Sequence, residues 1–200
     1  MELYSAPAGV GKRQPTRQTG NWRTFDATDG LGSGFVWDVL QDRHGYIWCA
    51  CYDGGVARFD GNTFQKFTTK QGLAHNEATC AFEATDGRLW FGSEGGVSVF
   101  DGEGNWQTLD IDDGLPHNEV AGIFQDAAGN IWLCTEHGVS RYDGESFYNL
   151  DSGNELVDNH VSCGLQDRHG HLWFGTEGGL CRYSDGVFTT YTRREGLPDN

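Results

Sequence analysis

Short apolar runs alternate along this chain with polar turns that contain glycine and aspartate. The clearest example gives four runs, at Phe35–Gln41, Tyr46–Cys51, Val56–Phe59 and Thr63–Thr69. The turns between them are Arg43-His44-Gly45, Asp53-Gly54-Gly55 and Asp60-Gly61-Asn62. Asp-Gly and Gly-Gly between apolar runs indicate β-hairpins, because the favoured hairpin turns need residues with positive φ. No segment keeps a helical period long enough to compete, so the pattern predicts short antiparallel strands.

The same pattern recurs through the chain with a fixed period. Tryptophan in the context G-x-[IL]-W occurs at intervals of 42, 42 and 41 residues, at Trp48, Trp90, Trp132 and Trp173. A leucine before each unit recurs at Leu31, Leu73, Leu115, Leu156 and Leu197. Later landmarks keep the spacing, at Gly55, Gly96, Gly138 and Gly179 and at Phe59, Phe100, Tyr142 and Tyr183. Four strands in about 42 residues are typical of a propeller blade. The predicted fold is all-β, a β-propeller of four-stranded antiparallel blades.

The repeats divide the chain into an arm and a propeller. Residues 1–20 match no repeat and form the predicted arm, and the propeller covers residues 21–200. Its predicted parts are an outer strand at 21–28, blades at 31–70, 73–112, 115–153 and 156–194, and the start of a further repeat at 195–200. Four blades and one extra strand predict a segment or a subunit of a larger ring, the alternative being a four-bladed ring with a surplus strand. An unpaired blade edge would also favour self-association.

The recurrent tryptophans have a structural explanation. Each lies on the second strand of its blade, where a large flat ring can fill the space between neighbouring sheets. Four equivalent placements favour this packing role over a surface that stacks on carbohydrate. The excess of glycine, 30 of 200 residues against a usual ~7%, follows from the tight turns of each blade.

Charge and composition narrow the class of partner. With 29 acidic and 14 basic residues the formal net charge is −15, so nucleic acid would be repelled and is not an expected partner. No apolar stretch approaches the ~20 residues that span a bilayer, so no membrane insertion is expected. Residues 1–18 lack the apolar core of a signal peptide, so the residues alone assign no compartment. The six cysteines favour small buried thiols over a disulfide framework.

Polar residues gather in the loop before the first strand of each blade, and we call these five segments the axial loops. In propellers, by analogy at the level of the fold, ligands bind where such loops converge on the axis. The third position of the loops holds Ser33, His75, His117, Asp158 and Asp199. The fourth position holds Asn76, Asn118, Asn159 and Asn200. Apart from Asn200, these residues are the predicted ligand-binding candidates.

Three interpretations of the axial loops are open. Their polar side chains can cap the loop by bonding to the backbone, or they can line a mouth for a small polar ligand or a protein. In the third and least favoured interpretation, His75, His117 and Asp158 hold a divalent metal ion. No cofactor is expected under the first two. His137 and His160 have no visible catalytic partner.

The repeat resembles a known family. Its pattern is seen at Gly114-Leu115-Pro116-His117-Asn118, Gly129-Asn130-Ile131-Trp132 and Arg141-Tyr142-Asp143-Gly144. This pattern, over residues 21–200, resembles the two-component-regulator propeller repeat. The resemblance implies the periplasmic or extracellular sensor region of a bacterial regulator, which detects a ligand and belongs to a signalling parent protein. More weakly, the repeats are similar to those of streptogramin lyase, which implies a divalent metal with His and Glu in the mouth. Glu77 and Glu119 would then supply the carboxylates.

The sequence therefore favours a non-catalytic module that binds a small polar ligand or a protein at an axial mouth. The alternative is a divalent-metal-dependent propeller enzyme of the lyase type, with its site in the same mouth.

Overall fold

Four antiparallel sheets of four strands each make up the described part of the chain. The computed structural model describes residues 22–154 and 156–199, so the predicted arm at 1–20 lies outside the described residues. In each sheet the strands that follow one another in sequence are neighbours. The predicted all-β fold with four-stranded blades is confirmed. Among the described residues there is no helix with the length and apolar character needed to cross a membrane.

The strand boundaries follow the repeat closely. Blade 1 comprises β1 (Val36–Gln41), β2 (Ile47–Cys51), β3 (Val56–Phe59) and β4 (Phe64–Phe67). Blade 2 comprises β5 (Ala78–Glu83), β6 (Leu89–Ser93), β7 (Gly96–Phe100) and β8 (Trp106–Leu109). Blade 3 comprises β9 (Val120–Gln125), β10 (Ile131–Thr135), β11 (Gly138–Tyr142) and β12 (Phe147–Leu150). Blade 4 comprises β13 (Val161–Gln166), β14 (Leu172–Thr176), β15 (Gly179–Ser184) and β16 (Val187–Tyr191).

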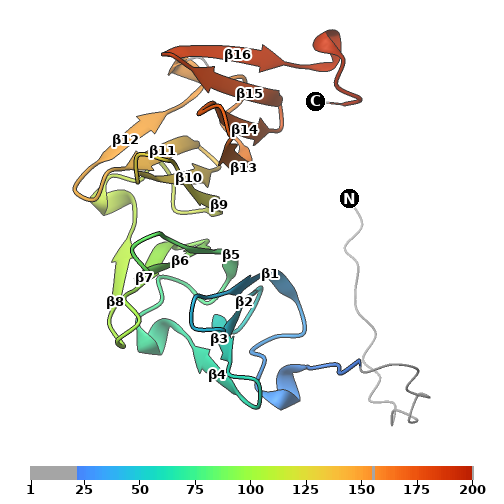
Figure 1. The fold of residues 1–200 in the computed structure, drawn as a ribbon, viewed down its shortest axis with the longest axis vertical. Helices are drawn as coiled ribbons and strands as arrows, with labels where there is room; N and C mark the ends of the chain where they lie inside the picture. The colour runs from blue at the N-terminus through green and yellow to red at the C-terminus, as the bar shows by residue number, and fades with distance from the viewer. Residues whose placement is uncertain (1–21, 155, 200) are drawn as a thin grey trace.

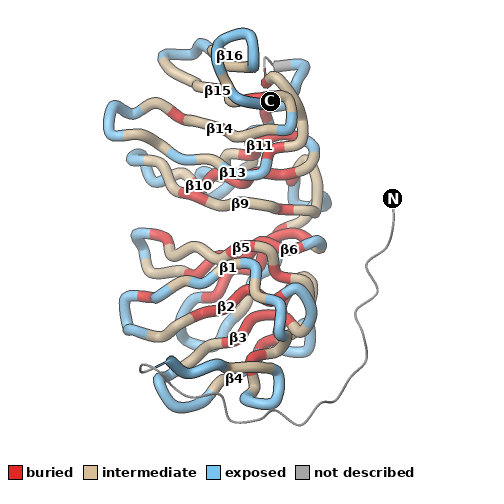
Figure 2. The backbone as a smooth tube through the Cα atoms, turned by 90° about the vertical axis from the view of Figure 1, so that its right-hand side faces the viewer, coloured by how far each residue is buried: buried red, intermediate tan, exposed pale blue. Residues whose placement is uncertain are grey.

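The four blades stand side by side in an arc (Figure 1). Their first strands, β1, β5, β9 and β13, contact one another in succession and lie on the concave side. The fourth strands lie on the outer side, and blades 1 and 4 stand at the two ends of the arc. The ring is therefore open over the described residues. Figure 2 shows buried positions within the strands, while many of the turns that join them are exposed.

Tryptophans of the second strands form the centre of the contacts between blades. Trp48 of blade 1 lies against Phe91 of blade 2, with ring centroids 5.3 Å apart. Trp48, Trp90 and Trp132 are 1%, 0% and 4% exposed, which confirms the predicted packing role. Trp173 lies on the last face of the arc and is only partly buried, because no described blade covers it.

An aspartate in the turn between the first and second strands anchors this tryptophan in three blades. The indole N–H donates from Trp48 to Asp42 at 2.8 Å, from Trp132 to Asp126 at 2.8 Å and from Trp173 to Asp167 at 2.9 Å. Blade 2 has Ala84 at this position, and the buried indole nitrogen of Trp90 has no hydrogen-bond partner. Among the four described blades, blade 2 is thus the one that lacks the aspartate acceptor for its tryptophan.

Hydrogen bonds favour the charged form of two of the aspartate anchors, Asp126 and Asp167. Burial works against the charge of Asp126, but hydrogen bonds from Asn130 and Trp132 outweigh it and lower the pKa of Asp126. The hydrogen bond from Trp173 is the largest cause that keeps the pKa of Asp167 well below its usual range. Asp126 and Asp167 therefore each join the turn to the core through a charge-assisted hydrogen bond.

The segment before blade 1 differs from its prediction. A strand is expected at 21–28, whereas residues 22–26 belong to no sheet and Ala27–Asp29 form a 3₁₀ turn. Phe25 still packs on Phe59 and Phe64, with ring centroids 5.0 and 5.3 Å away. The segment keeps the packing register of an outer strand but lacks a partner strand among the described residues.

The cysteines are all free, and five of the six are buried as predicted. Cys163 is exposed, and the expectation of a buried thiol is wrong at this position. It shares its register with Cys80, whose sulfur points at Val120 of the next blade. Cys163 occupies the same position on the first strand of blade 4, and the structure describes no blade beyond it.

Substitutions at the aspartate position that anchors the tryptophan test its contribution to stability. Asp126→Ala leaves the indole N–H of Trp132 and the amides of Ala128 and Asn130 without their acceptor. We expect a loss of about 1–3 kcal/mol in the free energy of unfolding. Ala84→Asp supplies the acceptor that Trp90 lacks, and a gain of about 1 kcal/mol is expected. Urea unfolding of both variants measures these changes. A destabilised Ala84→Asp protein would contradict this account of the anchor.

Candidate functional site

Two kinds of segment build one rim of the axial space: the axial loops and the hairpins between second and third strands. In blades 1, 2 and 4 the hairpin bonds to the segment just before the first strand of its own blade, as Tyr52 N donates to Phe35 O at 3.1 Å. In blades 1 to 3 the hairpin also bonds to the axial loop of the next blade, as Gly55 N donates to Asn76 O at 2.7 Å. The second bond recurs at the same distance from Gly96 to Asn118 and from Gly138 to Asn159. These bonds fix the rim, which we call the mouth.

The third position closes its own turn in the first four axial loops. The side chain accepts the backbone N–H two residues later in Ser33 (3.1 Å), His75 (3.2 Å), His117 (3.1 Å) and Asp158 (2.8 Å). Serine, histidine and aspartate are interchangeable here because each offers an acceptor atom at a similar reach. The identity of the third residue therefore follows from loop closure.

The fourth position caps the 3₁₀ turn that precedes the loop. The side-chain oxygen accepts a backbone N–H from Thr69 to Asn76 (2.9 Å), from Ile111 to Asn118 (3.0 Å) and from Ser152 to Asn159 (2.6 Å). The capping interpretation describes this geometry, and a ligand contact by these residues stays a prediction. Asp199, in the last loop, is exposed and forms an ion pair with Arg193 at 3.5 Å.

The bonded histidines constrain the metal interpretation. His75 lies with Glu77 and Glu94, and an equivalent cluster joins His117, Glu119 and Glu136; in each, the possible ligand atoms lie within 4.8 Å of one another. The Nδ1 atom of each histidine already accepts a backbone N–H. The neutral ring then carries its proton on Nε2 and has no lone pair there for a metal. A metal would have to break the loop bond first, and Asp158 belongs to no such cluster among the described residues.

The fifth position of the axial loop and the hairpin residue paired with it change from blade to blade. The pairs are Phe35 with Tyr52, Glu77 with Glu94, Glu119 with Glu136, and His160 with Glu177. We call the hydrogen bonds that hold the axial loops and hairpins in place the loop frame. These bonds use the backbone of the paired residues and not their side chains; Glu94 N, for example, donates to Glu77 O at 3.4 Å. The mouth is consequently aromatic at blade 1, acidic at blades 2 and 3 and mixed at blade 4.

A β-bulge at the start of each first strand adds a further side chain to the axial space. The pairing of first and second strands skips one residue, at Trp37, Thr79, Ala121 and Ser162. Bulges re-aim side chains and are common beside functional sites. The position again differs between blades, from a large aromatic to a methyl group.

These variable positions meet around one cavity. It has a volume of about 250 Å³ and is lined by Trp37, Tyr52, Glu77, Thr79, Glu94, Glu119 and Ala121. Hydrogen bonding to Glu94 is the largest cause that raises the pKa of Glu77, with burial and repulsion from the same carboxylate adding to it. The cavity thus combines aromatic surface with crowded carboxylates.

Two histidines without a visible partner in the sequence have one in the structure. His137 lies against His117, with ring centroids 4.4 Å apart. His160 Nδ1 lies 3.7 Å from Glu136 Oε1, and its Nε2 lies 4.0 Å from Glu177 Oε1. Both belong to the mouth on the side of blades 3 and 4.

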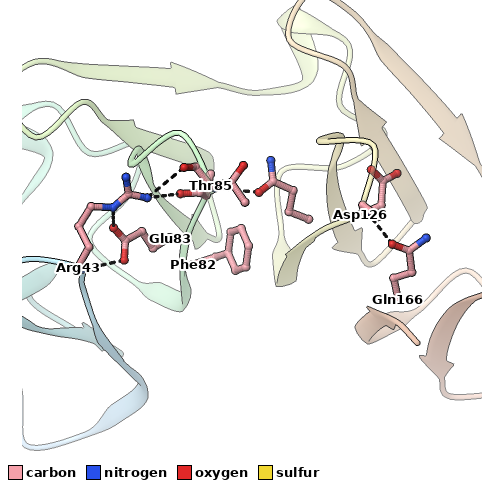
Figure 3. Close-up of a pocket in the computed structure, with 9 residues that line it drawn as sticks. Arg43, Phe82, Glu83, Thr85, Asp126 and Gln166 are labelled. Atoms are coloured by element: carbon pink, nitrogen blue, oxygen red, sulfur yellow. Dashed lines mark hydrogen bonds and ion pairs between the residues drawn. The ribbon is translucent and has the colours of Figure 1, made fainter. Parts of the chain in front are cut away.

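A wider cavity of about 770 Å³ lies at the other ends of the first strands (Figure 3). Its polar side chains are engaged in bonds between blades. Thr85 N donates to Gln125 Oε1 at 2.9 Å, Ala127 N donates to Gln166 at 2.6 Å, and Arg43 pairs with Glu83. Because these groups already have partners, the mouth is the better candidate site.

Sequence reasoning identified the loops but not the side chains that line the cavity. Its candidates at the third and fourth positions lie on the mouth, where their polar atoms serve the backbone. It missed Trp37, Tyr52 and Glu94, and it considered Glu77 and Glu119 only for the lyase alternative. A usable signal was present, because these positions vary between blades while their neighbours stay constant.

Two neighbouring residues of one axial loop test whether the residues that hold the loop in place differ in role from those that line the cavity. Asn118→Ala removes the cap of the 3₁₀ turn at Ile111–Asp113, and we expect a loss of about 1 kcal/mol in the free energy of unfolding. Glu119→Gln, one residue later, keeps the side-chain shape and should change stability by less than about 0.5 kcal/mol. Thermal unfolding of both variants measures the difference. Equal losses would contradict the division of roles.

Comparison with known proteins gives a family for the repeat. Residues 30–53, 72–95, 114–137 and 155–178 match the family described as two component regulator propeller. A comparison with curated proteins gives no match.

Solved structures show the same architecture. The chain is similar to the extracellular domain of the putative hybrid two component system BT3049 from B. thetaiotaomicron, with a TM-score of 0.74 and 26% identity. The similarity covers 82% of this chain and 24% of that one, so the chain spans about a quarter of that domain.

Two more distant structures share the fold alone. Catalytically inactive virginiamycin B lyase from Staphylococcus aureus with quinupristin has a TM-score of 0.64 and 16% identity, covering 78% of this chain and 55% of that chain. PorZ, a surface component of the type-IX secretion system of Porphyromonas gingivalis, has a TM-score of 0.63 and 16% identity, covering 92% of this chain and 31% of that chain. From the repeat matches and the blades together, this chain is a β-propeller protein built from two component regulator propeller repeats.

Proposed function

We propose that this chain is a non-catalytic sensor module that binds a small polar ligand at the mouth. The observation that carries the proposal is the cavity beside blades 1 to 3, whose lining changes from blade to blade on a constant loop frame. Side chains with no bond to the frame are available to contact a ligand. Concave cavities that combine apolar surface with a few polar groups are the usual form of small-molecule sites.

The proposal includes a place outside the cytoplasm. The similar structures of BT3049 and BT4673 are extracellular domains of putative two component and one component systems. A chain of this kind would detect its ligand in the periplasm or outside the cell. Signalling would then be a property of a larger protein of which the propeller is the sensing part.

A thermal-shift screen tests the binding function. Wild-type protein is heated with neutral disaccharides, free amino acids, polyamines and quaternary amines, each at millimolar concentration. A ligand that binds only the folded state at about 100 times its dissociation constant stabilises it by about 2.7 kcal/mol. We expect one class to raise the unfolding temperature of the wild type but not of the double variant Trp37→Ala/Glu94→Gln.

The matched control for this screen is Thr85→Ala/Gln125→Ala at the opposite end of the first strands. It removes polar lining of the wider cavity and should keep the ligand-dependent shift. A shift that is lost in this control but kept in the mouth variant would overturn the choice of the mouth. The absence of any stabilising class would overturn the sensor proposal.

The alternative function is a metal-dependent enzyme of the lyase type. Two equivalent clusters of one histidine and two glutamates favour it. The bonded Nδ1 atoms of His75 and His117 weigh against it, since the loops would have to open to release a ligand atom. The two functions differ in one respect that the screen can measure. Binding by the sensor module persists in a chelator, whereas a metal-dependent site loses its ligand there.

Self-association forms a further part of the proposal. Leu165 of blade 4 and Val39 of blade 1 are 53% and 58% exposed. Their equivalents in the middle of the arc pack between blades: Phe124 shares the register of Leu165 and is buried, and Ile123 shares that of Val39 and is partly buried. Both ends of the arc thus present a face suited to another blade, and in the isolated chain a second copy can supply it.

Native mass spectrometry measures this self-association. The wild type should give a multiple of 22.1 kDa. Leu165→Lys places a charge on the end face of blade 4 and should shift the protein to the monomer, without unfolding it because the side chain is exposed. Tyr148→Lys changes an equally exposed residue on β12 and serves as the control. A wild type that stays monomeric at micromolar concentration would show that the ends do not pair.

A further inference from the structure

Three aromatic rings form one exposed cluster at the blade 1 side of the mouth. Phe35 and Trp37 lie with ring centroids 4.9 Å apart, and Tyr52 lies 5.7 Å from Phe35 and 6.3 Å from Trp37. All three rings are about half exposed, at 55%, 54% and 47%. Contiguous exposed apolar surface of this kind marks a place where something binds. Two of the three rings, Trp37 and Tyr52, line the 250 Å³ cavity.

The facing wall of the same cavity is negative. Its charged lining residues are Glu77, Glu94 and Glu119, all carboxylates. Glu77 and Glu94 are close enough to share a hydrogen bond, which raises the pKa of Glu77. Crowded carboxylates repel one another, and a cation placed between them would relieve that repulsion. The wall therefore favours a positively charged ligand.

The kind of cation follows from the aromatic wall and the histidine bonds. Metal ions of the hard class take oxygen ligands and gain little from indole or phenyl faces. His75, which lies with Glu77 and Glu94, has its Nδ1 lone pair bonded to a backbone N–H. Organic ammonium groups, by contrast, are attracted to the faces of Trp and Tyr rings and to carboxylates at once. The cavity is smaller than the ~300–1,000 Å³ of common ligand pockets, which suits a head group.

We propose that the mouth binds an organic ammonium cation, held between the rings of Trp37 and Tyr52 and the carboxylates of Glu77, Glu94 and Glu119. The inference rests on the proposed function and specifies the class of its ligand. The ammonium group lies against the aromatic wall, and the carboxylates face it from blades 2 and 3. Three kinds of variable position supply the contacts: the bulge residue Trp37, the hairpin residues Tyr52 and Glu94, and the axial-loop residues Glu77 and Glu119.

Isothermal titration of the full chain with choline tests the proposal. The matched ligand is dimethylbutanol, the neutral isostere in which carbon replaces nitrogen, so the pair differs in charge and not in shape. Choline should bind about tenfold more tightly than the isostere. Trp37→Ala should weaken choline binding by about tenfold, and Trp37→Phe by less, because phenylalanine keeps an aromatic face. Glu94→Gln should weaken it several-fold, and added salt should weaken it in the wild type.

Two controls separate the site from general acidity and exposed aromatic surface. Glu103→Gln removes a carboxylate from the turn between β7 and β8, and Tyr148→Ala removes an exposed ring on β12. Both should leave choline affinity unchanged, and thermal unfolding confirms that each variant is folded. Equal affinity for choline and its isostere, or equal losses in the controls, would overturn the ammonium proposal.

The outcomes also separate this inference from the proposed function. If a neutral ligand from the thermal-shift screen binds the mouth while choline and a second cation, spermidine, do not, the ammonium class is wrong and the sensor function stands. If no ligand of any class binds at the mouth, both are wrong.

Discussion

Face-to-face packing of successive blades is the interaction on which the rest of this structure depends. A single four-stranded sheet with two apolar faces cannot bury either of them alone. The tryptophans of the second strands in blades 1 to 3 fill the space between neighbouring sheets, and in blades 1 and 3 an aspartate in the adjoining turn satisfies the indole N–H. Because hairpins bond to the axial loop of the next blade, as Gly55 does to Asn76, the same packing also sets the spacing of the mouth.

The frame leaves a defined set of side chains available for function. Loop closure engages the third position through acceptors such as His75 Nδ1, and turn capping engages the fourth through asparagine. The bulge residue Trp37 and the hairpin residue Glu94 line the cavity with their side chains, whereas the bulge residue Thr79 also donates its hydroxyl to Val120 O of the next blade. At the opposite ends of the first strands the polar side chains join blade to blade (Figure 3). Polar side chains at that end are used in contacts between blades, whereas at the mouth backbone bonds such as Gly55 to Asn76 join the blades and the lining side chains can vary.

Much of the fold could be predicted from the sequence because its causes are local. Period, hairpin turns and the packing role of Trp48, Trp90 and Trp132 all follow from residues near one another in the chain. The cavity could not be predicted in the same way, since it depends on pairing across segments. Tyr52 meets Phe35 through a backbone bond, and Trp37 enters the axial space through a bulge. The exposure of Cys163 likewise depends on whether another blade covers blade 4, which no local pattern records.

The central claim is that the variable side chains of the mouth, and not the constant residues of the frame, contact the ligand. The tryptophan indoles provide internal probes of this claim. Nitrogen–proton correlation spectra of the chain, recorded during a choline titration, follow each indole N–H separately. The account predicts that the Trp37 signal moves while those of Trp48 and Trp132, which are bonded to aspartates, stay in place. A Trp37 signal that does not move, or shifts centred on the backbone amides of Thr85 and Ala127 at the opposite end, would contradict it.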